Sequence, residues 1–206
     1  RHAGTGVQAS SSHYILIGYQ DVIMSWSCGV ALGKQAKTIN KAQIDAAVGY
    51  LNKTRHAERN QVIFLLSTKA GLRAKEIANL TWAMVTDADG HVGSMIALTD
   101  KASKGNRGGR VIPINRDLRL ALQTLRAMPS LSRPSEFVIT TERASKTSAQ
   151  SIVNLFRMWY RELGFNGCSS HSGRRTFITN AARRISTVGG SLRDVQALAG
   201  HSNLST

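Results

Sequence analysis

Apolar residues at helical spacing toward the C-terminal end of the chain constrain its fold most strongly. Ile152, Leu155, Phe156, Trp159 and Leu163 recur three and four positions apart, so they share one face of an α-helix. A face this apolar must be buried against other elements of the same domain. Similar spacing predicts further helices over 41–51, around 62–66, over 73–80, around 118–125, over 172–185 and over 191–200.

The middle of the chain follows a different pattern, which predicts strands. Residues 82–100, WAMVTDADGHVGSMIALTD, alternate around an Asp89-Gly90 turn, and GGRVIPI at 108–114 is a third strand-like run. Alternation around a turn of this type is typical of an antiparallel hairpin. We therefore predict an α+β fold that is mostly α-helical, with a small three-stranded antiparallel sheet flanked by helices.

The charge balance predicts a polyanionic partner. Among 206 residues, 27 Lys and Arg stand against 12 Asp and Glu, which gives a formal net charge of +15. Solubility does not require so large a charge, and nucleic acid is the first candidate partner. Acidic membranes are less favoured because the basic residues recur throughout the chain instead of on one amphipathic helix. An RNA-binding protein is supported by the charge alone.

The cysteine content indicates the cellular compartment, and a change in composition indicates the domain organisation. The two cysteines, Cys28 and Cys168, are too few for a disulfide framework or a four-cysteine zinc site. We predict a cytoplasmic protein with no metal ion and no cofactor. The composition changes near Gly33, which divides the chain into a segment of uncertain structure at 1–33 and a domain at 34–206. Gln20 and Asp21 interrupt the apolar part of the first segment, so a signal peptide is not favoured.

Several short segments carry candidate anion-binding residues. His171 and Arg174 lie three positions apart, so both project from one face of a predicted helix and could converge on one phosphate. Arg73 opens another predicted helix, where free N–H groups and the helix dipole favour an anion. Lys104 lies in a glycine-rich basic turn, and His201 follows a predicted helix end. Each signal is weak alone, because a solvated basic surface explains such residues equally well.

Taken together, five motifs resemble the tyrosine site-specific recombinases, the phage integrase family. They are GLRAKEI, SKGNRGGRVIPI, HSGRRTF, LAGH and HSNLST, and they occur in the family's order between residues 34 and 206. The resemblance implies the catalytic-domain fold of that family. It also implies a set of catalytic residues: the arginines Arg73 and Arg174, the hairpin lysine Lys104, and the histidines His171 and His201.

The resemblance further implies that the chain acts on double-stranded DNA. Such an enzyme cleaves and rejoins strands in site-specific recombination or integration, through a 3′-phosphotyrosyl intermediate that needs neither ATP nor a metal ion. Exchange between two duplexes implies four copies in a synaptic tetramer, with the protein located at the nucleoid. Basic residues beside the motifs are the candidates for further DNA contacts, namely Lys101, Arg107, Arg110 and Arg175.

The same resemblance assigns a role to each catalytic residue. Arg73 and Arg174 would hold the non-bridging oxygens of the phosphate through forked, always-charged guanidiniums. Lys104 would protonate the departing 5′ oxygen. His171 would accept or orient the tyrosine proton, and His201 would donate to a phosphate oxygen.

One departure from the family concerns the nucleophile. The family places a tyrosine about nine residues after the second histidine, whereas this sequence ends at Thr206. Tyr14, Tyr19, Tyr50 and Tyr160 lie in no matching context, and Tyr160 is predicted to be a core or rim aromatic. The chain is therefore expected to be truncated and inactive as a fragment. Two alternatives stay open, a non-catalytic DNA-binding remnant and an enzyme like a type IB topoisomerase.

Overall fold

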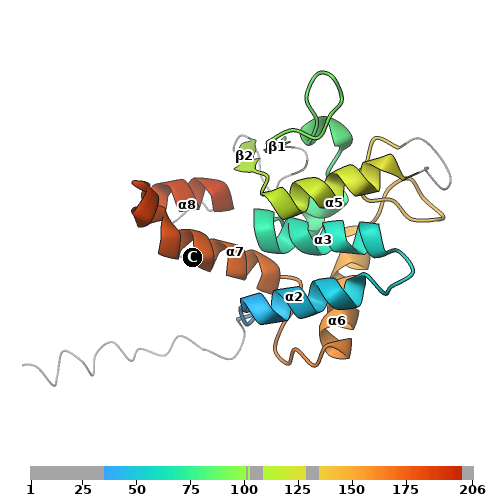
Figure 1. Cartoon of the computed structure of the whole chain (residues 1–206), viewed down its shortest axis with the longest axis horizontal. Helices are drawn as coiled ribbons and strands as arrows, with labels where there is room; N and C mark the ends of the chain where they lie inside the picture. Colours follow the sequence, from blue (N-terminus) through green and yellow to red (C-terminus); the bar gives the residue numbers. More distant parts are fainter. Residues whose placement is uncertain (1–34, 101, 103–108, 129–134, 201–206) are drawn as a thin grey trace, which may run out of the picture. The chain divides into compact units, whose positions relative to one another are not determined.

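Helix α3 (Ala57–Ala70) lies at the centre of the fold in the computed structural model, which describes residues 35–100, 102, 109–128 and 135–200. Residues 62–66 of α3 are consecutive and all buried, so the protein covers this helix on every side. Helices α2 (Lys41–Leu51), α5 (Arg116–Ala127) and α7 (Ser172–Arg184) pack against it, and α3 lies between α2 and α5 (Figure 1). The described residues from Ala36 onward form one compact unit.

The remaining helices also occur where the sequence predicts them. Side chains cap several helix starts: Asn40, Asn115 and Ser148 each accept a hydrogen bond from the backbone N–H three residues later, which satisfies a donor that the helix itself leaves free. The other elements are α4 (Ala74–Ala78), α6 (Ala149–Glu162) and α8 (Leu192–Ala199), with two short 3₁₀ helices, η2 (Trp82–Met84) and η3 (Ile185–Val188).

Helix α6 carries the apolar face that the sequence predicts, and this face forms an aromatic core. Phe156 and Trp159 are buried, with ring centroids 5.3 Å apart in an edge-to-face arrangement, and Phe64 of α3 lies 6.4 Å from Phe156. Tyr160 is buried beside them, and this burial raises the pKa of its hydroxyl. Of the two positions that the sequence allows for Tyr160, core or rim, the structure shows the core.

The sheet has two strands among the described residues, so the prediction of three was wrong. Strand β1 (Met95–Leu98) pairs antiparallel with β2 (Arg110–Pro113), with Leu98 opposite Arg110. The segment expected to form the first strand begins as η2 instead. The backbone N–H and the hydroxyl of Thr86 both donate to the Trp82 carbonyl, which curls the chain. Only a single bridge, between Thr86 and Val92, then closes the predicted turn.

Two glycines bring α3 and α7 close together. Gly71 ends α3 in the left-handed conformation (φ +66°), and a Cβ atom there would overlap the ring of Phe177 from α7. At Gly173, a Cβ atom would lie 2.5 Å from Oγ of Ser67 on α3. Only a residue without a side chain fits such an approach. Arg174 of α7 is thereby placed beside the end of α3.

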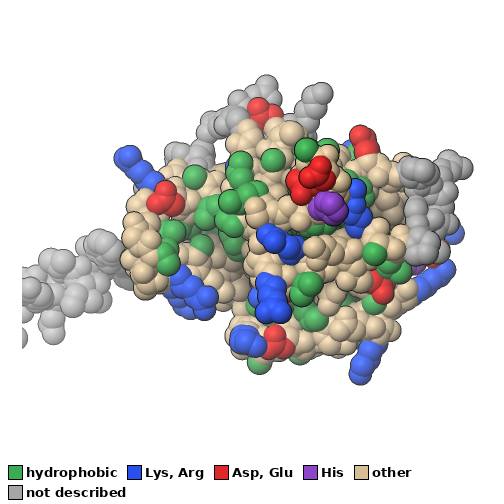
Figure 2. Space-filling view, turned by 45° about the horizontal axis from the view of Figure 1, so that its top comes forward, with side chains coloured by type: hydrophobic (Ala, Val, Ile, Leu, Met, Phe, Trp, Pro, Cys, Tyr) green, Lys and Arg blue, Asp and Glu red, His purple; other side chains and the backbone are tan. Residues whose placement is uncertain are grey.

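The surface carries its positive charge in several places. Lys and Arg side chains occur at separate points on the face shown in Figure 2, with acidic side chains and a histidine among them. None of the helices in the described part of the chain combines the length and apolarity that a membrane span requires.

Candidate functional site

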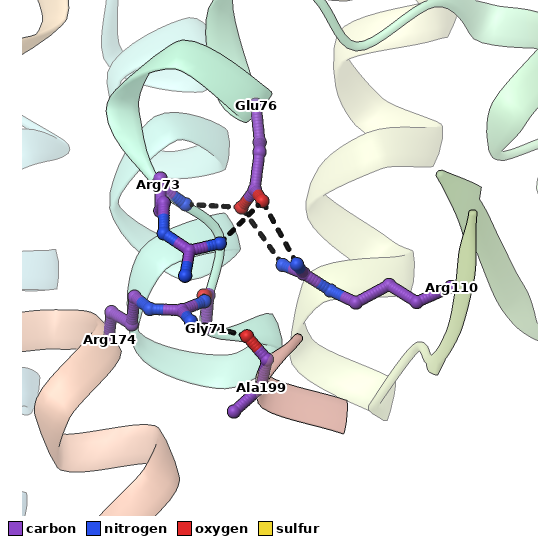
Figure 3. A network of polar contacts seen from close by, with 6 residues as sticks. All are labelled: Gly71, Arg73, Glu76, Arg110, Arg174 and Ala199. Carbon is purple, nitrogen blue, oxygen red and sulfur yellow. Dashed lines mark hydrogen bonds and ion pairs between the residues drawn. The ribbon is translucent and has the colours of Figure 1, made fainter. Parts of the chain in front are cut away.

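Three predicted site residues meet in one place, together with Glu76. Arg73 precedes α4, Arg110 begins β2, and Arg174 lies in the first turn of α7. Their guanidinium groups gather beside the Glu76 carboxylate and the ends of α3 and α8 (Figure 3). We call Arg73, Glu76, Arg110 and Arg174 the arginine cluster.

Glu76 holds two of the three arginines. Its Oε1 accepts hydrogen bonds from Nη1 of Arg73 at 3.0 Å and from Nη1 of Arg110 at 2.9 Å. Its Oε2 accepts from the backbone N–H of Arg73 at 2.7 Å and from Nη2 of Arg110 at 2.9 Å. The pair formed with Arg110 is therefore bidentate, the strongest geometry between these two groups. The Glu76 side chain is 1% exposed, against 10% for Arg110 and 27% for Arg73.

Arg174 has backbone partners instead of a carboxylate. Its Nη1 donates to the Gly71 carbonyl at 2.5 Å, and its Nη2 donates to the Ala199 carbonyl. Gly71 caps the C-terminus of α3 and Ala199 is the last residue of α8. Carbonyls at helix C-termini lack partners within the helix and carry the negative end of its dipole, so they attract a cation. These bonds orient the guanidinium but leave its charge unneutralised.

The cluster therefore contains more positive than negative charge in a buried place. Arg174 is 5% exposed; this burial, the charge of Arg73 and that of Arg110 together lower its pKa to about 9. Burial acts to raise the pKa of Glu76, but the hydrogen bonds and charges of Arg110 and Arg73 outweigh it and lower this pKa. Three guanidiniums and one ionised carboxylate give a formal charge of +2. Such a site favours an anion.

The other predicted site residues lie apart from this buried cluster or outside the described residues. His171 is exposed at the start of α7, one turn before Arg174. Arg175 is also exposed, and its Nη1 donates to the Ala36 carbonyl at 2.9 Å. The placement of four residues stays a prediction because they lie outside the described residues: Lys101, Lys104, Arg107 and His201.

Two features of the site go beyond the sequence prediction. The ion pair between Arg73 and Glu76 joins residues three positions apart, a spacing at which side chains meet at a helix start. The hydrogen bond between Glu76 and Arg110 joins residues 34 positions apart, and no local sequence pattern predicts it. The backbone carbonyls that hold Arg174 have no side-chain signature at all. A glycine that ends a helix, such as Gly71 or Gly200, is the only sequence signal for them.

Known proteins are similar to this chain in sequence and in fold. Residues 37–206 match the phage integrase family. The chain is 30% identical over 151 residues to tyrosine recombinase XerA of Pyrococcus horikoshii, covering 72% of this chain and 48% of that protein. It is 31% identical over 150 residues to tyrosine recombinase XerC of Proteus mirabilis, covering 72% and 45%. The chain thus spans about half the length of these curated relatives.

Solved structures agree with this assignment at the level of the fold. The crystal structure of XerA recombinase superposes with a TM-score of 0.62 at 17% identity, covering 82% of this chain and 57% of that one. The Tn1549 transposon integrase in complex with a circular intermediate DNA gives a TM-score of 0.65 at 15% identity, covering 92% and 69%. The predicted mostly helical fold with a small antiparallel sheet is confirmed.

Proposed function

Because the chain belongs to the phage integrase family, we propose that it carries the phosphate-binding centre of a tyrosine recombinase. This enzyme cleaves and rejoins double-stranded DNA through a 3′-phosphotyrosyl intermediate. The observation that carries the proposal is the arginine cluster, in which one buried carboxylate pairs with two guanidiniums and a third, that of Arg174, is held by backbone carbonyls. A phosphodiester is the anion that this surplus of forked, permanently charged donors suits best.

Arg174 and Arg73 are the residues that contact the phosphate in this proposal. A guanidinium has five N–H donors, and the Gly71 and Ala199 carbonyls account for two hydrogen bonds of Arg174. In this proposal the remaining donors of Arg174 bond a non-bridging oxygen. Arg73 bonds Glu76 through Nη1 and is the most exposed of the three arginines. Its outer edge is therefore accessible to DNA.

The remaining chemistry is assigned from the motifs. Lys104 protonates the departing 5′ oxygen, His171 accepts the proton of the attacking tyrosine, and His201 donates to a phosphate oxygen. Tyr160 does not serve as the nucleophile, because it is buried in the aromatic core. Charge neutralisation rests on arginine, so the step needs no metal ion.

Double-stranded DNA and further copies of the chain are the proposed partners. The Tn1549 transposon integrase was solved in complex with DNA, and the net charge of +15 suits the same partner here. Strand exchange between two duplexes requires four active sites, so we propose a synaptic tetramer assembled on DNA. The site of action is then the nucleoid.

The test is covalent capture of the protein on DNA. The protein encoded by the complete open reading frame is incubated with nicked suicide duplexes that carry the DNA flanking its gene. We expect a covalent protein–DNA adduct that survives denaturing electrophoresis and disappears on digestion of the protein. Arg174→Ala should abolish it, whereas Arg161→Ala, which removes an exposed arginine of α6, should not. Equal adduct yields from these two variants, or none from the wild type, would refute the proposal.

A further inference from the structure

We infer that Arg110 is a positioning residue that holds the phosphate-binding arginines in place through Glu76 and the end of α8. This inference rests on the proposed function and deepens it. It also gives Arg110 a different role from the direct DNA contact that the sequence suggests.

The contacts of Arg110 are the first argument. Both of its terminal nitrogens bond the Glu76 carboxylate, each at 2.9 Å. The remaining nitrogen, Nε, is buried and has no hydrogen-bond partner among the described residues. The side chain is 10% exposed. The charge of Arg110 is therefore paired with a carboxylate, whereas the partners of Arg174 are neutral carbonyls, so we place the phosphate contact with Arg174 and a supporting role with Arg110.

The hydrogen-bond capacity of Glu76 is the second argument. An ionised carboxylate has about four lone-pair sites, and four hydrogen bonds reach Glu76, two from Arg73 and two from Arg110. With every site occupied, the carboxylate has one orientation. That orientation fixes both the backbone N–H and the guanidinium of Arg73. Without Arg110, half of the bonds are lost and the carboxylate can rotate.

The packing of Arg110 against α8 is the third argument. A Cβ atom at Gly200 would lie 2.5 Å from Nη1 of Arg110, and α8 also contacts β2. The Ala199 carbonyl that accepts from Arg174 directly precedes Gly200. Arg110 therefore supports, on one side, the carboxylate that orients Arg73 and, on the other, the helix end that orients Arg174.

The first experiment separates positioning from DNA contact. Single-turnover adduct formation on the nicked duplex is measured at saturating DNA, and the Kd for the same duplex is measured over a salt series. We expect Arg110→Met to lower the rate by about 10²-fold, as the loss of an oriented oxyanion donor does, with the Kd and its salt dependence unchanged. Arg116→Met, at an exposed arginine of α5, should leave both unchanged. A weaker Kd with a wild-type rate at saturation would overturn the inference in favour of a DNA contact.

The pH dependence of the rate of adduct formation is a second measurement, and a purely structural role of Arg110 would not change it. Among the described residues, the charged groups that interact with Glu76 are Arg73 at the start of its own helix, Arg110 on β2 and Arg174 on α7. Without Arg110, burial raises the pKa of Glu76, and its protonation at low pH releases Arg73. The rate of Arg110→Met should therefore rise with pH through this raised pKa, whereas the wild-type rate should show no such step. An identical pH profile in the two proteins would contradict the inference.

Two further variants keep the inference testable if Arg110→Met folds poorly. Arg110→Lys keeps a positive charge beside Glu76 but lacks the two parallel donors of a guanidinium. It should recover part of the rate of adduct formation. The double variant Arg110→Met/Glu76→Gln removes both buried charges, so it should fold while remaining as slow as the single variant. A fast double variant would refute the positioning role. An absent wild-type adduct would instead refute the proposed function, so the two failures are distinguishable.

Discussion

Replacing Gly173 by alanine should destabilise the protein, although the same change usually stabilises a helix. The added Cβ would lie 2.5 Å from Oγ of Ser67 and 3.0 Å from both Cβ of Ser67 and Cγ2 of Thr68. Helix α7 must then move away from α3, and overpacking of this kind costs about 1–3 kcal/mol. Alanine gains at most about 1 kcal/mol over glycine in backbone entropy. We expect a net loss of about 1–2 kcal/mol in the free energy of unfolding.

A matched control exists in helix α2. At Gly49, an added Cβ meets no atom within 4 Å, so Gly49→Ala should raise the free energy of unfolding by about 0.5–1 kcal/mol. Urea denaturation, followed by circular dichroism, measures both variants. The two glycines thus predict opposite signs for one chemical change. If Gly173→Ala proved as stabilising as Gly49→Ala, the close approach of α7 to α3 would be wrong.

A double-mutant cycle locates the clash. Oγ of Ser67 is buried and has no hydrogen-bond partner among the described residues, so Ser67→Ala alone should be neutral or stabilising. In the Gly173→Ala background it also removes the nearest atom, so it should recover a large part of the lost stability. Additive effects within about 0.5 kcal/mol would show that the two positions are not in contact. Because Arg174 follows directly, the recovered stability should be accompanied by recovered adduct formation.

Further predictions concern the arginine cluster and the end of α8 beside it. Arg174→Lys should reduce adduct formation by about 10²-fold or more in the single-turnover assay, because an ammonium cannot supply the fork. Glu76→Gln should lower the free energy of unfolding in urea by about 3–5 kcal/mol, because it leaves buried guanidiniums without a charge partner. The pKa of Glu76 in the folded protein lies below its ordinary value. The stability that ionised Glu76 contributes is therefore complete above the ordinary pKa and is lost as the pH falls through the folded pKa. This loss of stability at low pH should be absent from the acid denaturation curve of Glu76→Gln. Gly200→Ala should lower the free energy of unfolding in urea by about 1–2 kcal/mol, because the residue has φ +58° and an added Cβ atom would lie 2.5 Å from Nη1 of Arg110. Sulfate should raise the thermal midpoint of the wild type more than that of Arg174→Gln, and an equal rise would place the anion elsewhere.

The sequence predicts the helices well because apolar spacing records burial directly. Ile152, Phe156 and Trp159 appear at the spacing that buries one helix face. The missing strand shows where this reasoning fails. The segment at 82–86 belongs to the run that predicts strands, but the hydrogen bonds that Thr86 makes to the Trp82 carbonyl depend on its immediate backbone geometry. Alternation alone does not reveal that competition.

The site was predictable in its residue types but not in its pairings. The motifs place arginine at positions 73, 110 and 174, and a spacing of three positions at a helix start brings Glu76 within reach of Arg73. Tertiary packing decides which arginine makes the remaining hydrogen bonds to Glu76, since Arg110 reaches it from a strand 34 positions away. The same applies to the Ala199 carbonyl, which any residue type would supply.

The distribution of partners in the cluster matches the charge that the reaction develops. A phosphodiester carries one negative charge, and attack by an oxyanion creates a pentavalent transition state that carries a second. Three guanidiniums and the single carboxylate of Glu76 give the cluster a formal charge of +2, which complements the transition state better than the ground state. A second carboxylate on Arg174 would cancel this difference. Arg174 is bound instead by two neutral carbonyls at helix C-termini, which fix its direction and leave its full charge for the phosphate. Burial and the neighbouring arginine charges lower the pKa of Arg174 to about 9, and a phosphate bound there, as proposed, would offset the cost of that burial.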